Sequence, residues 1–198
     1  MKKLRVLFIG VMFFGLAGST FAQQMDVAIG FGTVRSAAVS SSQAAQIFPP
    51  VSLTGGLYPV ISGDVSIRKH LAVGGEISWR GGQGNYDLSQ PYRPIFWDFD
   101  ALYLPKLGPH AQAEFSAGIG AESTRFYTNY INCSFTSCTN YNTSSHFLGQ
   151  FGAGLKLYAK GGLFVRPEVH LYMVNNNLEY TSAYVVRYGA SIGYTFGH

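Results

Sequence analysis

The chain has 198 residues, of which 12% are charged and 15% aromatic, and 24 are glycine. A typical soluble domain carries about 25% charged residues, so low charge with many aromatic side chains favours a protein whose surface faces lipid. After residue 22 the chain holds 11 basic and 10 acidic residues, which leaves no basic excess for nucleic-acid binding.

The first 22 residues have the pattern of a secretory signal peptide. Basic residues in 1–5 precede an apolar run over 6–16, and small residues in 18–22 end at Ala22. The apolar run is shorter than the roughly 20 residues that a membrane-spanning helix needs. We predict cleavage after Ala22 and one domain over residues 23–198.

Apolar and polar side chains alternate along eight segments of this domain, as they do in strands. In the last segment, Val186, Tyr188 and Ala190 lie on one face, and Arg187 and Gly189 lie on the other. The predicted strands are approximately 25–35, 58–67, 71–80, 93–104, 111–127, 147–159, 163–174 and 185–196.

The connections between these strands alternate in length. Three are short and four are long: the short ones lie near 68–70, 105–110 and 160–162, and the long ones near 36–57, 81–92, 128–146 and 175–182. Short periplasmic turns that alternate with long outer loops are typical of outer-membrane barrels. The pattern predicts an all-β fold, an eight-stranded antiparallel up-and-down transmembrane β-barrel with both termini at the short-turn end.

Nearly every charged residue within a predicted strand lies on the polar face. These residues are Asp64, Glu76, Arg80, Asp98, Asp100, Glu114, Glu122, Lys156, Arg166, Glu168 and Arg187. An Arg or Lys facing lipid at the midplane costs about 2–4 kcal/mol, so we expect this face to line the barrel interior. A soluble barrel with its polar face in water is the alternative. An eight-stranded barrel is filled by its side chains, so the interior charges form either a network of ion pairs or a narrow, cation-favouring path.

The strand count, the order of the connections and the closing strand, which ends in Tyr194-Thr195-Phe196, resemble the outer-membrane protein β-barrel family. This family comprises the small eight-stranded OmpA-, OmpX- and OmpW-like barrels of Gram-negative bacteria, and the resemblance covers essentially all of residues 23–198. It implies a location in the bacterial outer membrane, contact with outer-membrane lipid, and recognition of the C-terminal strand by the assembly machinery. In this sequence Gly197 and His198 follow the final aromatic residue.

Cys133 and Cys138 lie five positions apart in one of the long connections. Behind a signal peptide they reach an oxidising compartment, which favours a disulfide within the loop. Free thiols and a metal site are the alternatives, but the neighbouring residues supply no further metal ligands. No cofactor is predicted.

Two histidines raise the alternative of a hydrolase. His170 shares the inward face of one strand with Arg166 and Glu168, and a histidine beside a carboxylate can act as a general base. His146 follows Ser144 and Ser145 at the outer rim, where some lipid-modifying eight-stranded barrels place a His and a Ser. The sequence names no third, orienting group.

We therefore predict a non-enzymatic barrel with a structural or surface-interaction role. Loops 36–57 and 128–146 are the expected contact surfaces for an extracellular ligand, because Tyr and Asn are dense in the second and suit adaptable binding. The alternatives are a narrow channel or carrier for a small hydrophobic or cationic solute, and a lipid-modifying hydrolase at the rim.

Overall fold

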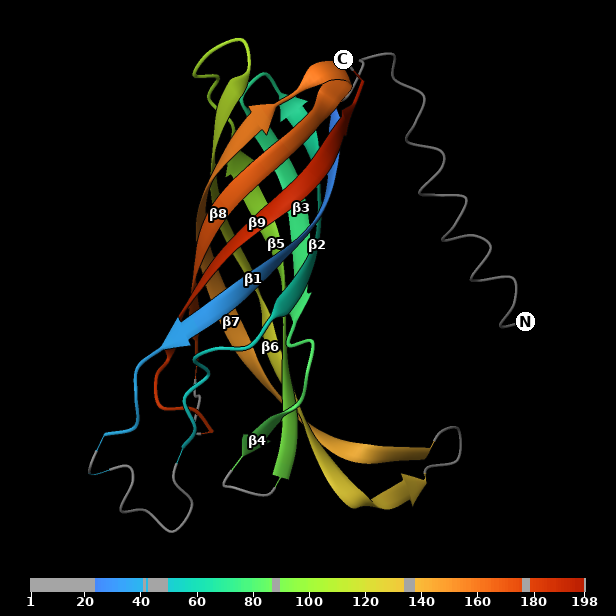
Figure 1. Cartoon of the computed structure of the whole chain (residues 1–198), viewed down its shortest axis with the longest axis vertical. Coiled ribbons are helices and arrows are strands. Elements are labelled where there is room, and N and C mark those ends of the chain that lie inside the picture. The colour runs from blue at the N-terminus through green and yellow to red at the C-terminus, as the bar shows by residue number, and fades with distance from the viewer. Residues whose placement is uncertain are drawn as a thin grey trace.

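The computed structural model describes residues 24–40, 42, 50–86, 90–133, 138–175 and 179–197, so the predicted signal peptide lies outside the described residues. The described part is an antiparallel β-barrel (Figure 1). Its strands are β1 Met25–Ser36, β2 Tyr58–Arg68, β3 Leu71–Trp79, β4 Gly84–Tyr86, β5 Gln90–Tyr103, β6 Ala111–Cys133, β7 Cys138–Tyr158, β8 Leu163–Val174 and β9 Tyr184–Phe196.

Each barrel strand pairs with its neighbours in sequence, and two further pairings close the sheet. β9 pairs with β1, and β3 pairs with β5, so eight strands form the wall while the short β4 pairs only with β5. Met25 lies opposite Phe196, at the end of the barrel that carries the short turns (Figure 1). The predicted eight-stranded antiparallel β-barrel is confirmed.

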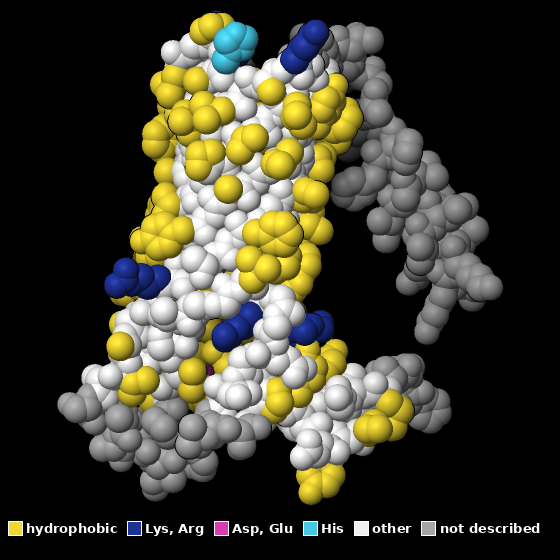
Figure 2. Space-filling model, viewed as in Figure 1, with side chains coloured by type: hydrophobic (Ala, Val, Ile, Leu, Met, Phe, Trp, Pro, Cys, Tyr) yellow, Lys and Arg dark blue, Asp and Glu magenta, His cyan; other side chains and the backbone are white. Residues whose placement is uncertain are grey.

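The two faces of the wall differ in the way the alternation predicts. Along β8, Leu163, Val165 and Val169 point outward and are exposed, whereas Arg166 and Glu168 point inward and are buried. Exposed hydrophobic residues of the other strands, such as Ile29, Phe99 and Ile119, form a belt of hydrophobic side chains, and Figure 2 shows one face of it. The described residues include no helix of the length and apolarity needed to cross a membrane.

The connection predicted as a long loop over 128–146 is instead mostly strand, and this part of the prediction is wrong. β6 and β7 stay paired beyond the barrel rim, with Tyr127 opposite Tyr141 and Cys133 opposite Cys138. We call residues 127–133 and 138–141 the hairpin extension. Both of its faces lie outside the belt and carry polar residues, so the sequence shows no apolar alternation there. Similarly, Gly84–Tyr86 forms β4 within the predicted loop 81–92.

Candidate functional site

The barrel interior holds the charged residues that the alternation places on the polar face. Nine of the eleven are at most 7% exposed, and Arg80 and Asp100 are half-buried. Asp26 is also buried, at 2% exposure. It was not among the predicted interior residues, although its position beside the outward Val27 marks it as inward.

Lys156 lies at the centre of the first group of interior contacts. Its Nζ is 2.7 Å from Asp26 Oδ2, 3.2 Å from Asp64 Oδ2 and 3.0 Å from Glu114 Oε2. The ammonium is fully buried, so the three carboxylates replace its hydration. This cluster joins β1, β2, β6 and β7 across the barrel.

Arg166 contacts one carboxylate oxygen of Glu114, Oε1, and Lys156 contacts the other, Oε2. Its Nη1 is 2.9 Å from Glu114 Oε1, and its Nε is 2.7 Å from Glu168 Oε2. Nη2 donates to Ser62 Oγ at 2.8 Å. The guanidinium therefore uses separate nitrogens for separate partners, which fixes its orientation.

Arg187 ends the chain of ion pairs on the loop side. Its Nη1 is 3.0 Å from Glu168 Oε1, Nη2 contacts Glu76, and Nε donates to the Tyr172 hydroxyl at 3.0 Å. Acids and bases thus alternate in one connected network through the barrel interior. We call it the ion-pair network, and its members are Asp26, Asp64, Glu76, Glu114, Lys156, Arg166, Glu168 and Arg187.

Four of the predicted interior residues lie outside this network. Among the described residues, Asp98, Asp100 and Glu122 form no ion pair with a Lys or Arg. Glu122 accepts a hydrogen bond from Thr124. Arg80 donates to the Tyr92 hydroxyl at 2.9 Å and lies over its ring.

Glu76, Glu168 and His170 place their ligand atoms within 4.8 Å of one another, which is a geometry that could hold a metal ion. Arg187 already contacts both carboxylates, and Arg166 contacts Glu168. The arginines thus supply the positive charge that a metal would bring. The His170 Nδ1 lies 2.6 Å from the Gln150 side chain, and this histidine is a packed interior residue.

An apolar and aromatic cluster fills the loop end of the interior. We call it the mouth cluster; it comprises Val34, Leu53, Tyr58, Tyr92, Phe96, Leu148, Tyr172, Val174, Tyr180 and Val185. Leu53 and Tyr180 come from the loops and are at most 3% exposed, because a bridge between Val51 and Tyr180 draws both loops inward. Tyr172 stacks on Phe96 at 4.9 Å between ring centroids and also contacts Arg187, so the cluster adjoins the ion-pair network.

The cavity beside the ion-pair network is small. A cavity among Ser62, Glu76, Glu114 and His170 has a volume of about 10 Å³, which accommodates about one water molecule. The larger cavity of about 870 Å³ lies at the short-turn end and is lined by Lys106, His110 and Tyr158 among others. The geometry at the centre therefore favours the ion-pair interpretation of the interior charges over an open cation path.

A second polar group lies at the outer rim, where Glu179 joins two of the residues considered for hydrolysis. Ser144 Oγ donates to Glu179 Oε1 at 2.6 Å, and His146 Nε2 lies 3.0 Å from Glu179 Oε2. The same Nε2 lies 3.1 Å from Ser144 Oγ. Ser145 points to the other face of β7 and contacts Ser123.

This rim group lacks the geometry of a catalytic relay. In a Ser-His-acid triad the carboxylate binds one ring nitrogen and the serine binds the other. Here the serine and the carboxylate share Nε2, and the serine hydroxyl donates to the carboxylate. Partial burial raises the pKa of Glu179, but the hydrogen bond from Ser144 and the contact with His146 outweigh it and hold the pKa below its ordinary value. The arrangement ties the loop before β9 to β7.

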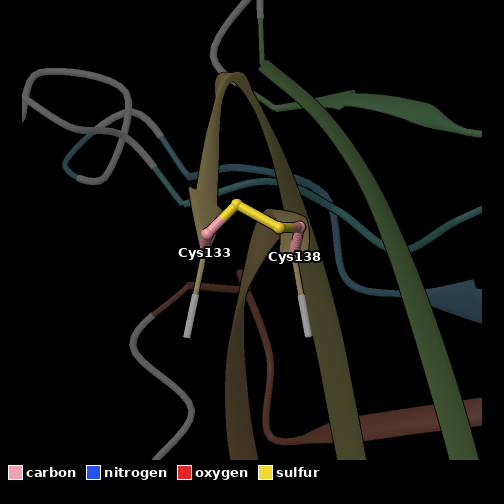
Figure 3. Close-up of a disulfide and its surroundings, with 2 residues drawn as sticks. All are labelled: Cys133 and Cys138. Atoms are coloured by element: carbon pink, nitrogen blue, oxygen red, sulfur yellow. A yellow bond between two sulfur atoms is a disulfide. The ribbon is translucent and has the colours of Figure 1, made fainter. Parts of the chain in front are cut away.

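The two cysteines lie at the end of the hairpin extension. Cys133 and Cys138 are joined by a disulfide that links the last residue of β6 to the first of β7 (Figure 3). Tyr130 and Ile131 beside it are 80% and 71% exposed. Of the two expected contact loops, residues 128–133 and 138–146 thus belong to β6 and β7, whereas residues 134–137, 41 and 43–49 lie outside the described residues.

The comparisons with known proteins find likeness in structure alone. No protein-family model and no curated protein sequence matches the chain. Ail, the attachment invasion locus protein of Yersinia pestis, is 12% identical with a TM-score of 0.57, and the match covers 88% of this chain and 99% of Ail.

Two further barrels match to a similar degree. Neisserial surface protein A is 10% identical, with a TM-score of 0.57 and coverage of 90% of this chain and 98% of that protein. The N-terminal β-barrel domain of Pseudomonas aeruginosa OprF is 15% identical, with a TM-score of 0.52 and coverage of 88% and 99%. The chain therefore has the fold of the small eight-stranded outer-membrane β-barrels.

Proposed function

We propose that this chain is an integral outer-membrane protein with a non-enzymatic, surface-interaction role. The belt of exposed hydrophobic side chains supports insertion in a bilayer, because an apolar surface of this extent is costly in water. The segment 1–22 serves as the signal peptide that directs export. The closing strand β9, which ends in Tyr194, Thr195 and Phe196, is the segment that the assembly machinery recognises.

The observation that carries this proposal is the contrast between a filled interior and a projecting hairpin. The ion-pair network and the mouth cluster occupy the barrel, which disfavours a channel or carrier function. The shared Nε2 of His146 disfavours the rim hydrolase. The hairpin extension instead presents exposed Tyr130 and Ile131 beyond the rim, where a partner outside the cell can reach them.

Extracellular contact is expected at residues 128–146 and 36–57. Ail was solved in complex with the heparin analogue sucrose octasulfate, which makes a sulfated glycan a reasonable first probe for this chain. Aromatic side chains such as Tyr130 offer flat apolar faces against which a ligand can pack.

Membrane insertion is tested first, by heat-modifiability of the full chain in membrane fractions. Folded outer-membrane barrels resist SDS and migrate differently until they are boiled. A mobility shift on boiling, found in the outer-membrane fraction, is the expected result. A soluble periplasmic product without a shift would mean that the belt is not facing lipid, and the proposal would fail.

The interaction role is tested with a shortened hairpin. Replacing residues 129–139 by Asn-Gly joins Thr128 to Asn140 through a two-residue hairpin loop and leaves the barrel strands intact. Cells that display this variant should keep the heat shift but bind heparin-coated plates less than cells with the natural chain. Leu107→Ala, at the exposed short-turn end, is the control and should bind normally. Equal binding by the shortened variant would remove the hairpin from the proposal.

A further inference from the structure

The charges of this protein are divided between the inside and the outside of the barrel. Seven of the ten acidic residues are buried in the interior, and Asp100 is half-buried on the same face. Outside the interior, the described residues include one acidic side chain, Glu179. Seven basic side chains lie there: Arg35, Arg68, Lys69, Arg93, Lys106, Arg125 and Lys160. Figure 2 shows Lys and Arg at both borders of the belt.

Two of these basic residues are direct neighbours on the outer face. Arg93 on β5 lies opposite Arg125 on β6, and both belong to the outward set of their strands. Like charges placed directly opposite each other in a sheet are destabilising. No ion pair joins either guanidinium to a carboxylate within the part of the chain that the structure describes.

Two tyrosines hold this pair of guanidiniums on the surface of the wall. Arg93 Cζ lies 6.0 Å from the ring centroid of Tyr127, and Arg125 Cζ lies 4.8 Å from that of Tyr141. The tyrosines contact each other in turn, at 5.9 Å between centroids. Cation–π contacts of this kind orient a guanidinium while leaving its edge, which carries the N–H donors, available.

Arg93 also has an unused hydrogen-bond donor. Its Nη2 donates to the Gly81 carbonyl at 3.4 Å, but its buried Nε has no hydrogen-bond partner in the described structure. That nitrogen is enclosed by the protein, so a ligand from outside would reach the terminal nitrogens of the guanidinium and not Nε. An anion placed between Arg93 and Arg125 would relieve the repulsion between the two guanidiniums.

The level of the pair along the barrel indicates the source of the anion. Moving from Arg93 into the belt, the next outward residues of β5 are Ile95, Trp97 and Phe99. The pair thus lies at the loop-side border of the apolar belt, which is the level of lipid head groups in an inserted barrel. Arginine forms bidentate hydrogen bonds to phosphate.

We propose that Arg93 and Arg125, held by Tyr127 and Tyr141, form a binding site for the phosphate group of a membrane lipid head group. The inference rests on the proposed insertion in a membrane and adds a specific lipid contact to it. The site would fix the depth and rotation of the barrel in the outer leaflet.

The two tryptophans give an intrinsic readout for this site. Trp97 is two outward positions from Arg93 on β5, and Trp79 lies opposite Ile95 on β3. The full chain is reconstituted in phosphatidylcholine bilayers. Brominated phosphatidic acid, which carries a phosphomonoester head group, is then compared with brominated phosphatidylcholine as a quencher of tryptophan fluorescence.

The natural chain should prefer the phosphomonoester lipid by roughly fivefold for each arginine engaged. The double variant Arg93→Gln/Arg125→Gln should lose most of this preference. Arg68→Gln/Lys69→Gln removes the same charge at the short-turn end and should keep it. Equal quenching by both lipids in the natural chain, or equal loss in the two double variants, would overturn the site.

Two further measurements distinguish a lipid head group from a dissolved anion, and a failed site from failed insertion. If inorganic phosphate abolishes the preference while chloride at equal ionic strength does not, the site takes a dissolved anion and the assignment to lipid is overturned. Failure of insertion is recognised separately, because neither brominated lipid would then quench and no heat shift would appear. That result counts against the proposed function, whereas quenching without a head-group preference counts against the site alone.

Discussion

The two halves of the barrel interior are packed with chemically different side chains. Towards the short turns, Lys156, Arg166 and Arg187 are held among carboxylates. Towards the loops, the mouth cluster packs aromatic and aliphatic side chains, including Leu53 and Tyr180 from the loops themselves. Removing one partner of a buried charge leaves the other charge unpaired and costs much of the free energy of unfolding at once. Removing atoms from an apolar cluster lowers the free energy of unfolding in proportion to the cavity that is left. The two halves should therefore respond differently to substitution.

The largest effect is expected in the ion-pair network. Arg187→Ala leaves Glu76 and Glu168 without their shared guanidinium partner and removes the hydrogen bond to Tyr172. Removing one partner of a buried pair costs about 3–5 kcal/mol, and we expect a loss of that size in the free energy of unfolding. Urea titration of the barrel in lipid, followed by tryptophan fluorescence, measures it.

Two further variants distinguish charge pairing from loss of volume. Arg187→Met with Glu76→Gln removes both charges while Glu168 keeps Arg166, and it should recover more than half of the loss. The exposed Arg35→Ala should change the free energy by less than about 0.5 kcal/mol. If the paired variant is no more stable than Arg187→Ala, packing rather than charge pairing holds this half together.

The mouth cluster should show a smaller and more graded effect. Leu53 is fully buried, and Leu53→Ala should lower the free energy of unfolding by about 2–4 kcal/mol, as buried Leu→Ala substitutions do. Leu57→Ala, at 59% exposure, is the matched control and should be nearly neutral.

The conductance of Leu53→Ala in a planar bilayer tests which half of the interior closes the barrel. Both the natural chain and Leu53→Ala should be silent at all voltages, because the ion-pair network fills the barrel beneath the cluster. A steady current through Leu53→Ala would show that the mouth cluster alone closes the barrel, and it would revive the channel hypothesis.

The comparison also separates what the sequence predicts from what only the fold reveals. Alternation identifies Arg166 and Glu168 as inward residues, because period two along a strand is a local property. Alternation says nothing about Leu53 or Glu179, because both lie in loops. Their partners are distant in the sequence and come near them only once the barrel has closed. The hairpin extension was missed because neither of its faces meets lipid, so its strands lack the apolar signal.

The contacts of Glu179 with Ser144 and His146 should make the free energy of unfolding depend modestly on pH. The pKa of Glu179 is lowered in the folded protein from its ordinary value of 4.5, so the stability from its contacts is present above that value. It is lost as the pH falls through the lowered pKa. Since the Glu179 side chain is half-buried at the rim and still reached by solvent, we expect a contribution below about 1 kcal/mol.

Comparison with Glu179→Gln isolates this contribution. The difference in free energy of unfolding between the natural chain and the variant should be constant at neutral pH and should shrink as the pH falls below about 4.5. A difference that persists unchanged into strong acid would mean that the carboxylate charge is not what ties the loop before β9 to β7.

The smallest effect on the barrel is expected from the disulfide, because the hairpin extension lies outside the cooperative interior. Cys133 and Cys138 are five positions apart, so their bond closes a short loop and constrains the unfolded chain little. Cys133→Ala/Cys138→Ala should therefore change the free energy of unfolding of the barrel by less than about 0.5 kcal/mol. Cleavage by chymotrypsin near Tyr127, Tyr130 and Tyr141 should nevertheless become faster, because the extension frays without its cross-link. A large loss of barrel stability in this variant would mean that the extension and the barrel unfold as one unit, and that the projecting hairpin is part of the scaffold as well as its contact surface.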